Sequence, residues 1–132
     1  MHKGFIRAGA MLSALSVVLG AFGAHSIKEK VTPEVLAIFE TGVRYQIYHS
    51  IALLITGVLY MQFRNNAILW AGRLFISGIL LFSGSLYLLC YIKAAGLTEL
   101  SAVGMITPFG GVALVAGWLL LLTAVSARKK TV

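Results

Sequence analysis

The chain has 132 residues, of which 59% are hydrophobic and only 11% are charged, whereas about 25% charged residues is usual in a soluble domain. Its 11 Lys and Arg residues outnumber its 4 acidic residues, which gives a formal net charge of +7. The hydrophobicity excludes a disordered chain, and the scarcity of charge argues against a soluble domain and against a nucleic-acid-binding protein with a broad basic face. The composition therefore indicates an integral membrane protein.

Four apolar segments are long enough to cross a bilayer, which takes about 20 residues per helix. The expected spans are residues 8–27, 45–63, 74–92 and 106–127. The fourth starts near Pro108, because Thr107 can cap a helix that has a proline in its first turn; a helix that runs through Pro108 with a kink is the alternative. We predict an all-α polytopic membrane protein, with residues 1–132 forming a single domain of four transmembrane helices in a bundle.

The N-terminus also fits a second interpretation, a cleavable signal peptide. It has a basic start, an apolar stretch and small residues around Ala21, which are the three features of such a peptide. The apolar segment continues past this point as far as Ile27. This continuation favours a first span that is retained.

The charge-rich stretch of the chain, residues 28–44, lies between the first two spans. The Thr-Pro-Glu sequence at residues 32–34 is typical of a helix start, with a capping residue, a proline and an acid in order. The apolar residues that follow share one face, which predicts a short interfacial amphipathic helix over residues 33–43. This helix either bends at Gly42 or runs straight through it into the second span.

The charges also predict the orientation of the chain. Four spans place both termini and the loop between the second and third spans on one side of the membrane. That side holds seven basic residues and no acidic ones: Lys3, Arg7, Arg64, Arg73, Arg128, Lys129 and Lys130. The other side holds four basic and four acidic residues. The positive-inside rule therefore predicts that the N- and C-termini are cytoplasmic.

Small residues indicate where the helices pack, because in lipid they let helix backbones approach closely. The positions that we select from the first, third and fourth spans are Ser16, Gly20, Ala24, Gly84, Gly110 and Gly117. We favour packing within one chain for these positions. A contact between copies of the chain, or with another membrane protein, would use the same residues, so a homo-oligomer stays open.

The most distinctive polar residues are expected at the outer ends of the first two spans. They are His25, Glu40, Arg44, Tyr45, Gln46 and His49. Glu40 and Arg44 are one helical turn apart and are predicted to pair. Tyr45, Gln46 and His49 point to the opposite side of the helix. We expect His25 at a similar depth, so that these groups could converge on one pocket.

Three functional interpretations and one structural interpretation fit this cluster. The two histidines and Glu40 could bind a metal, His49 could relay protons, or the cluster could bind a small polar ligand or a lipid headgroup. The structural interpretation is a hydrogen-bonded network that fixes the bundle, and it is the one that we favour. The helix places Glu40 about 180° from His49, which argues against a shared metal, and we predict no metal site.

No catalytic motif is present in the sequence. It has no nucleotide-binding glycine loop, no serine-hydrolase elbow, no zinc-protease motif and no Asp. The single cysteine, Cys90, can form no disulfide within the chain and is expected to be a small buried apolar residue. We therefore predict a protein that is not an enzyme, uses no cofactor and binds no nucleic acid.

The basic C-terminus has two interpretations. Arg128, Lys129 and Lys130 could bind anionic lipid headgroups, each contributing about 1 kcal/mol near an acidic membrane surface. The alternative, which we favour, is that these residues act only as a positive-inside anchor.

Four segments of the chain resemble a known family. They are residues 20–25 (GAFGAH), 40–49 (ETGVRYQIYH), 81–87 (LFSGSLY) and 106–111 (ITPFGG). In this order, and over nearly the whole chain, they are similar to the small proteins grouped as domain of unknown function 423 (DUF423), which are related to eukaryotic transmembrane protein 256. The resemblance implies a four-span protein of the bacterial plasma (inner) membrane, and it brings no established activity with it.

The expected function follows from these observations. We expect an integral inner-membrane protein that is a non-enzymatic interaction or accessory protein, packed through seams of small residues. The alternative is a small transporter, or a ligand- or proton-binding membrane protein, that uses the polar cluster. Four short spans without a detectable inverted repeat make a monomeric transporter the weaker expectation.

Overall fold

The computed structural model describes residues 1–126, with the side chains of all of these except residues 98–101. Its four long helices are α1 (Lys3–Phe22), α2 (Pro33–Leu59), α3 (Asn66–Ala94) and α4 (Thr107–Ser126). A π-helical turn, η1 (Gly23–Ile27), continues α1, and a 3-10 helix, η2 (Thr98–Ile106), precedes α4. The described part of the chain contains no strand. This confirms the predicted all-α class.

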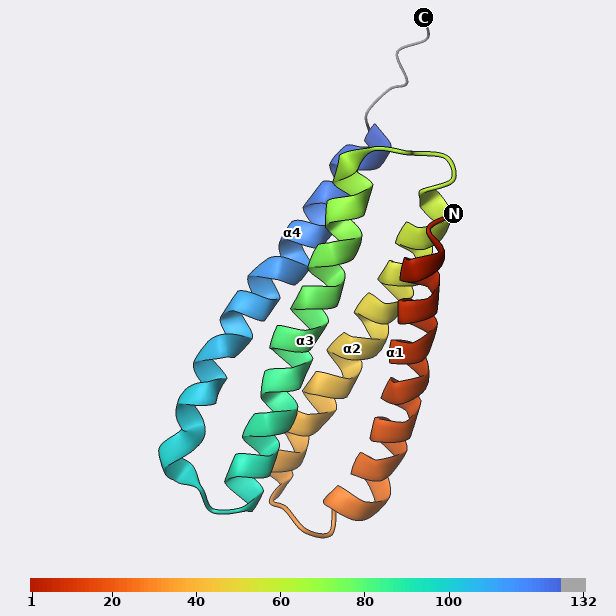
Figure 1. Ribbon diagram of the computed structural model, residues 1–132. Helices are drawn as coiled ribbons and strands as arrows, with labels where there is room; N and C mark the ends of the chain where they lie inside the picture. The colour runs from red at the N-terminus through yellow and green to blue at the C-terminus, as the bar shows by residue number, and fades with distance from the viewer. Residues whose placement is uncertain (127–132) are drawn as a thin grey trace, which may run out of the picture.

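The helices run up and down beside one another (Figure 1). α1 packs against α2, α2 against α3, and α3 against α4. α1 and α4 lie at opposite edges and, over the described residues, share no comparable interface. The start of α1, the end of α4 and the α2–α3 connection lie at one end of the bundle, which we call the terminal end. The α1–α2 and α3–α4 connections lie at the other, distal end.

Side chains cap three of the helix starts. His2, Thr32 and Asn65 each accept a hydrogen bond from the backbone N–H three residues later, at 3.2, 3.5 and 3.0 Å. These bonds satisfy N–H groups that have no partner inside the helix. α4 begins at Thr107, with Pro108 in its first turn, close to the predicted start. Thr107 is not the predicted cap, because its backbone is helical and its hydroxyl bonds to that of Ser85 at 2.7 Å.

α2 is one continuous helix from Pro33 to Leu59. Of the two alternatives at Gly42, a bend or a straight helix, the structure has the straight helix. Residues 33–43 therefore form the first turns of α2 and not a separate interfacial helix. Gly42 is buried against α3, where a Cβ would lie 2.7 Å from the ring of Tyr87. This close approach to α3 explains why the early turns of α2 belong to the bundle.

Three segments are long and apolar enough to cross a membrane by themselves: Lys3–Ile27, Asn66–Ala94 and Ala102–Ser126. α2 does not meet this criterion, because polar residues between Arg44 and Ser50 interrupt its apolar sequence. It lies between α1 and α3 and runs along both of them. A bilayer that holds its two neighbours therefore also encloses α2, and we describe it as the fourth membrane helix.

The small residues selected from the sequence have different surroundings. A Cβ added at Gly110 would overlap the backbone of Phe82, and one at Gly117 would lie 2.8 Å from the ring of Phe75, so both glycines allow α3 and α4 to pack closely. A Cβ added at Gly84 would have no described atom within 4 Å. Ala24 is exposed. Of the small residues selected from the third and fourth spans, Gly110 and Gly117 therefore lie in the α3–α4 interface and Gly84 does not.

Candidate functional site

A buried amide links three helices near the middle of the bundle. Gln46 is 2% exposed. Its Nε2 donates to the carbonyl oxygen of Leu12 on α1 at 3.0 Å, and its Oε1 accepts from the hydroxyl of Tyr87 on α3 at 2.8 Å. Because an unpaired polar group in this position would cost about 1–3 kcal/mol, these two bonds hold α1, α2 and α3 in one register.

Serine hydroxyls also occur on these three helices, and some of them bond within their own helix. Ser16 donates to Leu12 O at 2.9 Å, and Ser50 donates to Gln46 O at 2.6 Å. Two buried hydroxyls, those of Ser13 and Ser83, have no hydrogen-bond partner among the described residues. Gln46 itself is bonded through both ends of its amide, which matches its structural interpretation.

His49 is enclosed by aromatic rings. It is 7% exposed, and the ring centroids of Tyr45, Phe75 and Trp118 lie 5.9, 6.0 and 6.1 Å from its own. Its Nδ1 lies 2.7 Å from the carbonyl oxygen of Tyr45. A carbonyl oxygen only accepts, so Nδ1 carries the proton and donates it. The environment of His49 is that of a packed core residue with one internal hydrogen bond.

His25 lies far from this layer. It is exposed, in η1 at the distal end. The contacts of α1 with α2 set the register, since Gly23 packs on the ring of Phe39 and Gly9 packs on Ser50. At 1.5 Å per residue, His25 and His49 are about 20 Å apart along the bundle. The expectation that His25 and His49 lie at a similar depth was therefore wrong. It assumed that the second span begins at residue 45, whereas α2 begins at Pro33.

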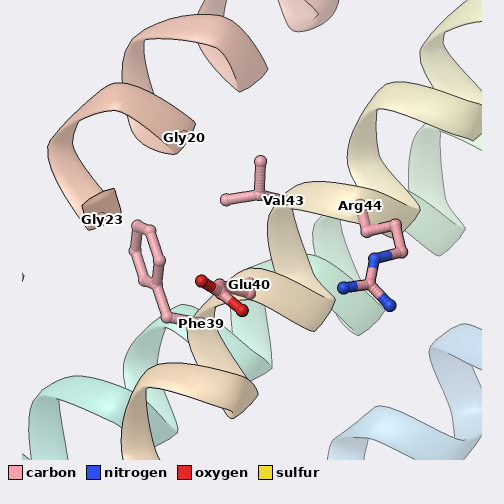
Figure 2. Close-up of a pocket in the computed structure, with 6 residues that line it drawn as sticks. All are labelled: Gly20, Gly23, Phe39, Glu40, Val43 and Arg44. Carbon is pink, nitrogen blue, oxygen red and sulfur yellow. The ribbon is translucent and has the colours of Figure 1, made fainter. Parts of the chain in front are cut away.

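Glu40 and Arg44 lie on the outside of the bundle, at a groove of about 360 Å³ between α1 and α2 (Figure 2). The groove is lined by Gly20, Gly23, Phe39, Glu40, Val43 and Arg44. Both charged side chains are exposed. Figure 2 shows the Glu40 carboxylate at the groove and the Arg44 guanidinium turned away from it. The predicted ion pair between these two residues is therefore not formed.

The depth of these two charges makes them unusual. α2 has 27 residues and is therefore about 40 Å long, against a hydrocarbon thickness of about 30 Å. If α2 is centred in the bilayer, the backbone of Arg44 lies about 12 Å inside the hydrocarbon, and that of Glu40 about 6 Å inside. Charged side chains at such depths pair with one another, reach headgroups or face a partner. Glu40 and Arg44 are thus exposed charges on a membrane helix, where charged side chains are costly.

The other selected residues do not extend this site. The described residues contain no group of three or more His, Cys, Asp or Glu side chains that could hold a metal ion. Tyr45 is 39% exposed, and its ring packs on Phe82 with a centroid distance of 4.5 Å. The predicted lipid-headgroup residues Arg128, Lys129 and Lys130 lie outside the described residues.

Two structural residues were not identified from the sequence. Tyr87 entered the sequence analysis only as part of the segment 81–87, with no role assigned to its hydroxyl, although a tyrosine hydroxyl in lipid needs an acceptor. Asn65 caps α3, and its Nδ2 donates to Ala124 O at 3.1 Å, which joins the start of α3 to the end of α4. The asparagine directly before an apolar run was the available signal.

Comparison with known proteins assigns the family. The model of the family described as "Protein of unknown function (DUF423)" matches residues 19–111, a range that contains all four segments on which the resemblance depended. The chain belongs to this family.

Relatives of the chain match it over nearly its whole length. The UPF0382 membrane protein SAB0533 of Staphylococcus aureus (strain bovine RF122 / ET3-1) is 43% identical over 122 residues, which cover 92% of this chain and 94% of the relative. The UPF0382 membrane protein YwdK of Bacillus subtilis (strain 168) is 40% identical over 123 residues, which cover 92% and 95%. No solved structure matches. These relatives are named as membrane proteins, and their names state no activity.

Proposed function

We propose that this protein is a non-enzymatic interaction protein of the bacterial plasma membrane, and that it self-associates through the groove between α1 and α2. The observation that carries the proposal is the pair of exposed charges, Glu40 and Arg44, which are not bonded to each other although they lie within the membrane helix. The partner is a second copy of the chain.

Charge complementarity favours a second copy over an unrelated helix. Two copies inserted in the same orientation are related by a twofold axis along the membrane normal, so their α2 helices run parallel. Arg44 of one copy is then one helical turn, about 6 Å, from the level of Glu40 of the other. The long Arg side chain can span this offset, as charged pairs do between parallel coiled-coil helices. One contact therefore forms two reciprocal Glu40–Arg44 pairs.

The shape of the groove supports the same arrangement. Gly20 and Gly23 line its α1 side, and a Cβ at Gly20 would meet only Val43, at 3.6 Å. Small residues at a helix surface let a second helix approach closely in lipid. Charge pairing and close packing thus favour the same face of the bundle.

The orientation of the protein is part of the proposal. The terminal end carries the basic residues Lys3, Arg7, Arg64 and Arg73, whereas the described distal residues have both signs of charge. The positive-inside rule supports a cytoplasmic terminal end. The alternative function, a transporter or a ligand- or proton-binding protein, has less support, because both ends of the Gln46 amide are bonded within the bundle and His25 and His49 are far apart.

Co-purification of two differently tagged copies from lipid nanodiscs or mild detergent tests the proposal. We expect the wild-type copies to co-purify and the Glu40→Gln/Arg44→Gln variant to lose this association. The control variant Lys28→Gln/Glu34→Gln removes one charge of each sign from exposed positions outside the groove and should behave as wild type. A wild-type protein that is strictly monomeric would overturn the proposal.

A further inference from the structure

A second cavity, of about 290 Å³, opens between η1, α2 and α3 at the distal end. Its wall is almost entirely apolar, and rings of Phe22, Phe39, Tyr87 and Tyr91 form much of it. The buried thiol of Cys90 also lines it, and Lys30 is its one charged lining residue among those described. We call this space the apolar compartment.

A polar cavity of about 410 Å³ adjoins the apolar compartment. The charged and hydroxyl groups that line it are Glu29, Lys30, Thr32 and Lys93. The two cavities share Lys30, Val31 and Ala94 in their walls, so they meet beside Lys30. We call the second space the polar compartment.

The position of the two compartments matches the layers of a bilayer. The polar compartment lies where α2 begins and α3 ends, at headgroup level. Tyr87 precedes Lys93 by six residues on α3, so the apolar compartment extends about 9 Å further toward the bilayer centre. A ligand that occupied both spaces would have a polar end at the surface and an apolar end in the hydrocarbon.

The charges of the polar compartment favour an anionic group. Lys30 and Lys93 outnumber Glu29. The first turn of α2, which begins after Thr32, adds the positive end of a long helix dipole, part of which Glu34 in the same turn offsets. The end of α3 contributes the opposite partial charge, which Lys93 offsets. A phosphate monoanion or diester therefore suits this compartment better than a cationic or neutral group.

We propose that the distal end is a binding site for one anionic phospholipid, with its phosphate beside Lys30 and Lys93 and one acyl chain in the apolar compartment. A volume of about 290 Å³ is at the lower limit of small-molecule pockets and suits a single chain rather than two. The π-helical turn η1 contributes Ser26 and Ile27 to the wall, and such turns are frequent at functional sites. This site is separate from the Glu40–Arg44 groove, with which it shares only Phe39.

Native mass spectrometry of the full chain tests the assignment. The protein is released from micelles that contain equal amounts of phosphatidylglycerol and phosphatidylcholine with identical acyl chains. We expect one retained phosphatidylglycerol per chain, favoured over phosphatidylcholine by about fivefold for each contributing lysine. Equal retention of the two lipids would overturn the proposal.

Matched variants locate the site. Lys30→Gln/Lys93→Gln should abolish the preference for phosphatidylglycerol, whereas Lys3→Gln/Arg7→Gln, with the same loss of charge at the terminal end, should keep it. Ala94→Trp places a ring where the compartments meet and should reduce retention of phosphatidylglycerol, whereas the exposed neighbour Ala95→Trp should not. If a variant and its control change the retention of phosphatidylglycerol equally, the lipid does not bind at the distal end and the proposal is contradicted.

Competition with ligand fragments separates a lipid site from a phosphate site and needs no variant. Lysophosphatidylglycerol, with one acyl chain, should displace phosphatidylglycerol from the wild-type protein, and glycerol 3-phosphate at the same concentration should not. If glycerol 3-phosphate competes equally well, the site recognises a free phosphate and the lipid proposal is overturned. If dodecanoate alone competes as well as lysophosphatidylglycerol, the phosphate has no role in binding. This result would also overturn the proposal.

Discussion

Gln46 and Tyr87 are joined by a hydrogen bond of 2.8 Å between the amide oxygen and the phenol hydroxyl, across the α2–α3 interface. The other end of the same amide bonds to the backbone of α1. One polar side chain thus sets the register of three helices in a region where water cannot supply a substitute partner. This arrangement fits the hydrogen-bonded structural network that we favoured from the sequence over a ligand site.

Removal of the tyrosine hydroxyl tests this role. In Tyr87→Phe the amide oxygen of Gln46 loses its partner, and we expect the free energy of unfolding to fall by about 0.5–2 kcal/mol. Gln46→Leu should be destabilising as well, and the double variant less so than the sum of the two. Unfolding by sodium dodecyl sulfate in mixed micelles, followed by circular dichroism, gives these values. Strict additivity would show that the two side chains are not coupled.

The glycines of α3 and α4 provide a second prediction. A Cβ at Gly110 would overlap the backbone of Phe82, which cannot move without displacing α3, so Gly110→Ala should destabilise the protein by about 1–3 kcal/mol. Gly84 has open space around it, so Gly84→Ala should be neutral or should stabilise the helix by up to about 1 kcal/mol. Similar losses for both variants would argue against the α3–α4 interface described above.

The helices themselves were predictable, and their contacts were not. Local chemistry determines where α2 starts, because the Thr32 cap and the proline after it act within one turn. Gly84 and Gly110 look alike in the sequence, and only the position of the neighbouring helix decides which of them is buried. The same applies to depth: Gln46 and His49 were placed at the outer end of a span because charged Arg44 precedes them, whereas α2 continues for three further turns before that residue.

The two unpartnered hydroxyls give a third prediction. Ser83 is 1% exposed, and its hydroxyl has no partner among the described residues. Ser83→Ala should therefore leave the free energy of unfolding unchanged or raise it by about 1 kcal/mol, since it removes a polar group that folding desolvates. Ser50→Ala serves as the comparison, because its hydroxyl is bonded to Gln46 O, and it should be the more destabilising of the two. The micelle unfolding assay distinguishes these outcomes, and the reverse order would contradict the assignment.

The orientation is tested with single cysteines in a Cys90→Ser background, which removes the one native thiol. Gly4→Cys lies at the terminal end, and Lys28→Cys lies at the distal end; both positions are exposed. A membrane-impermeant maleimide added to spheroplasts should label the distal position, and it should label the terminal position only after the membrane is disrupted. Labelling in the opposite order would reverse the proposed topology.

The central claim is that Glu40 and Arg44 form reciprocal pairs between two copies of the chain, and charge reversal tests it most directly. Glu40→Arg leaves two cations on each copy at the contact and Arg44→Glu leaves two anions on each copy, so each variant alone should repel its own copies and be monomeric. When the two variants are co-expressed with different tags, each cation of one faces an anion of the other, and they should co-purify as strongly as wild-type copies. Failure of the two variants to associate, or self-association of either one alone at the wild-type level, would contradict the account.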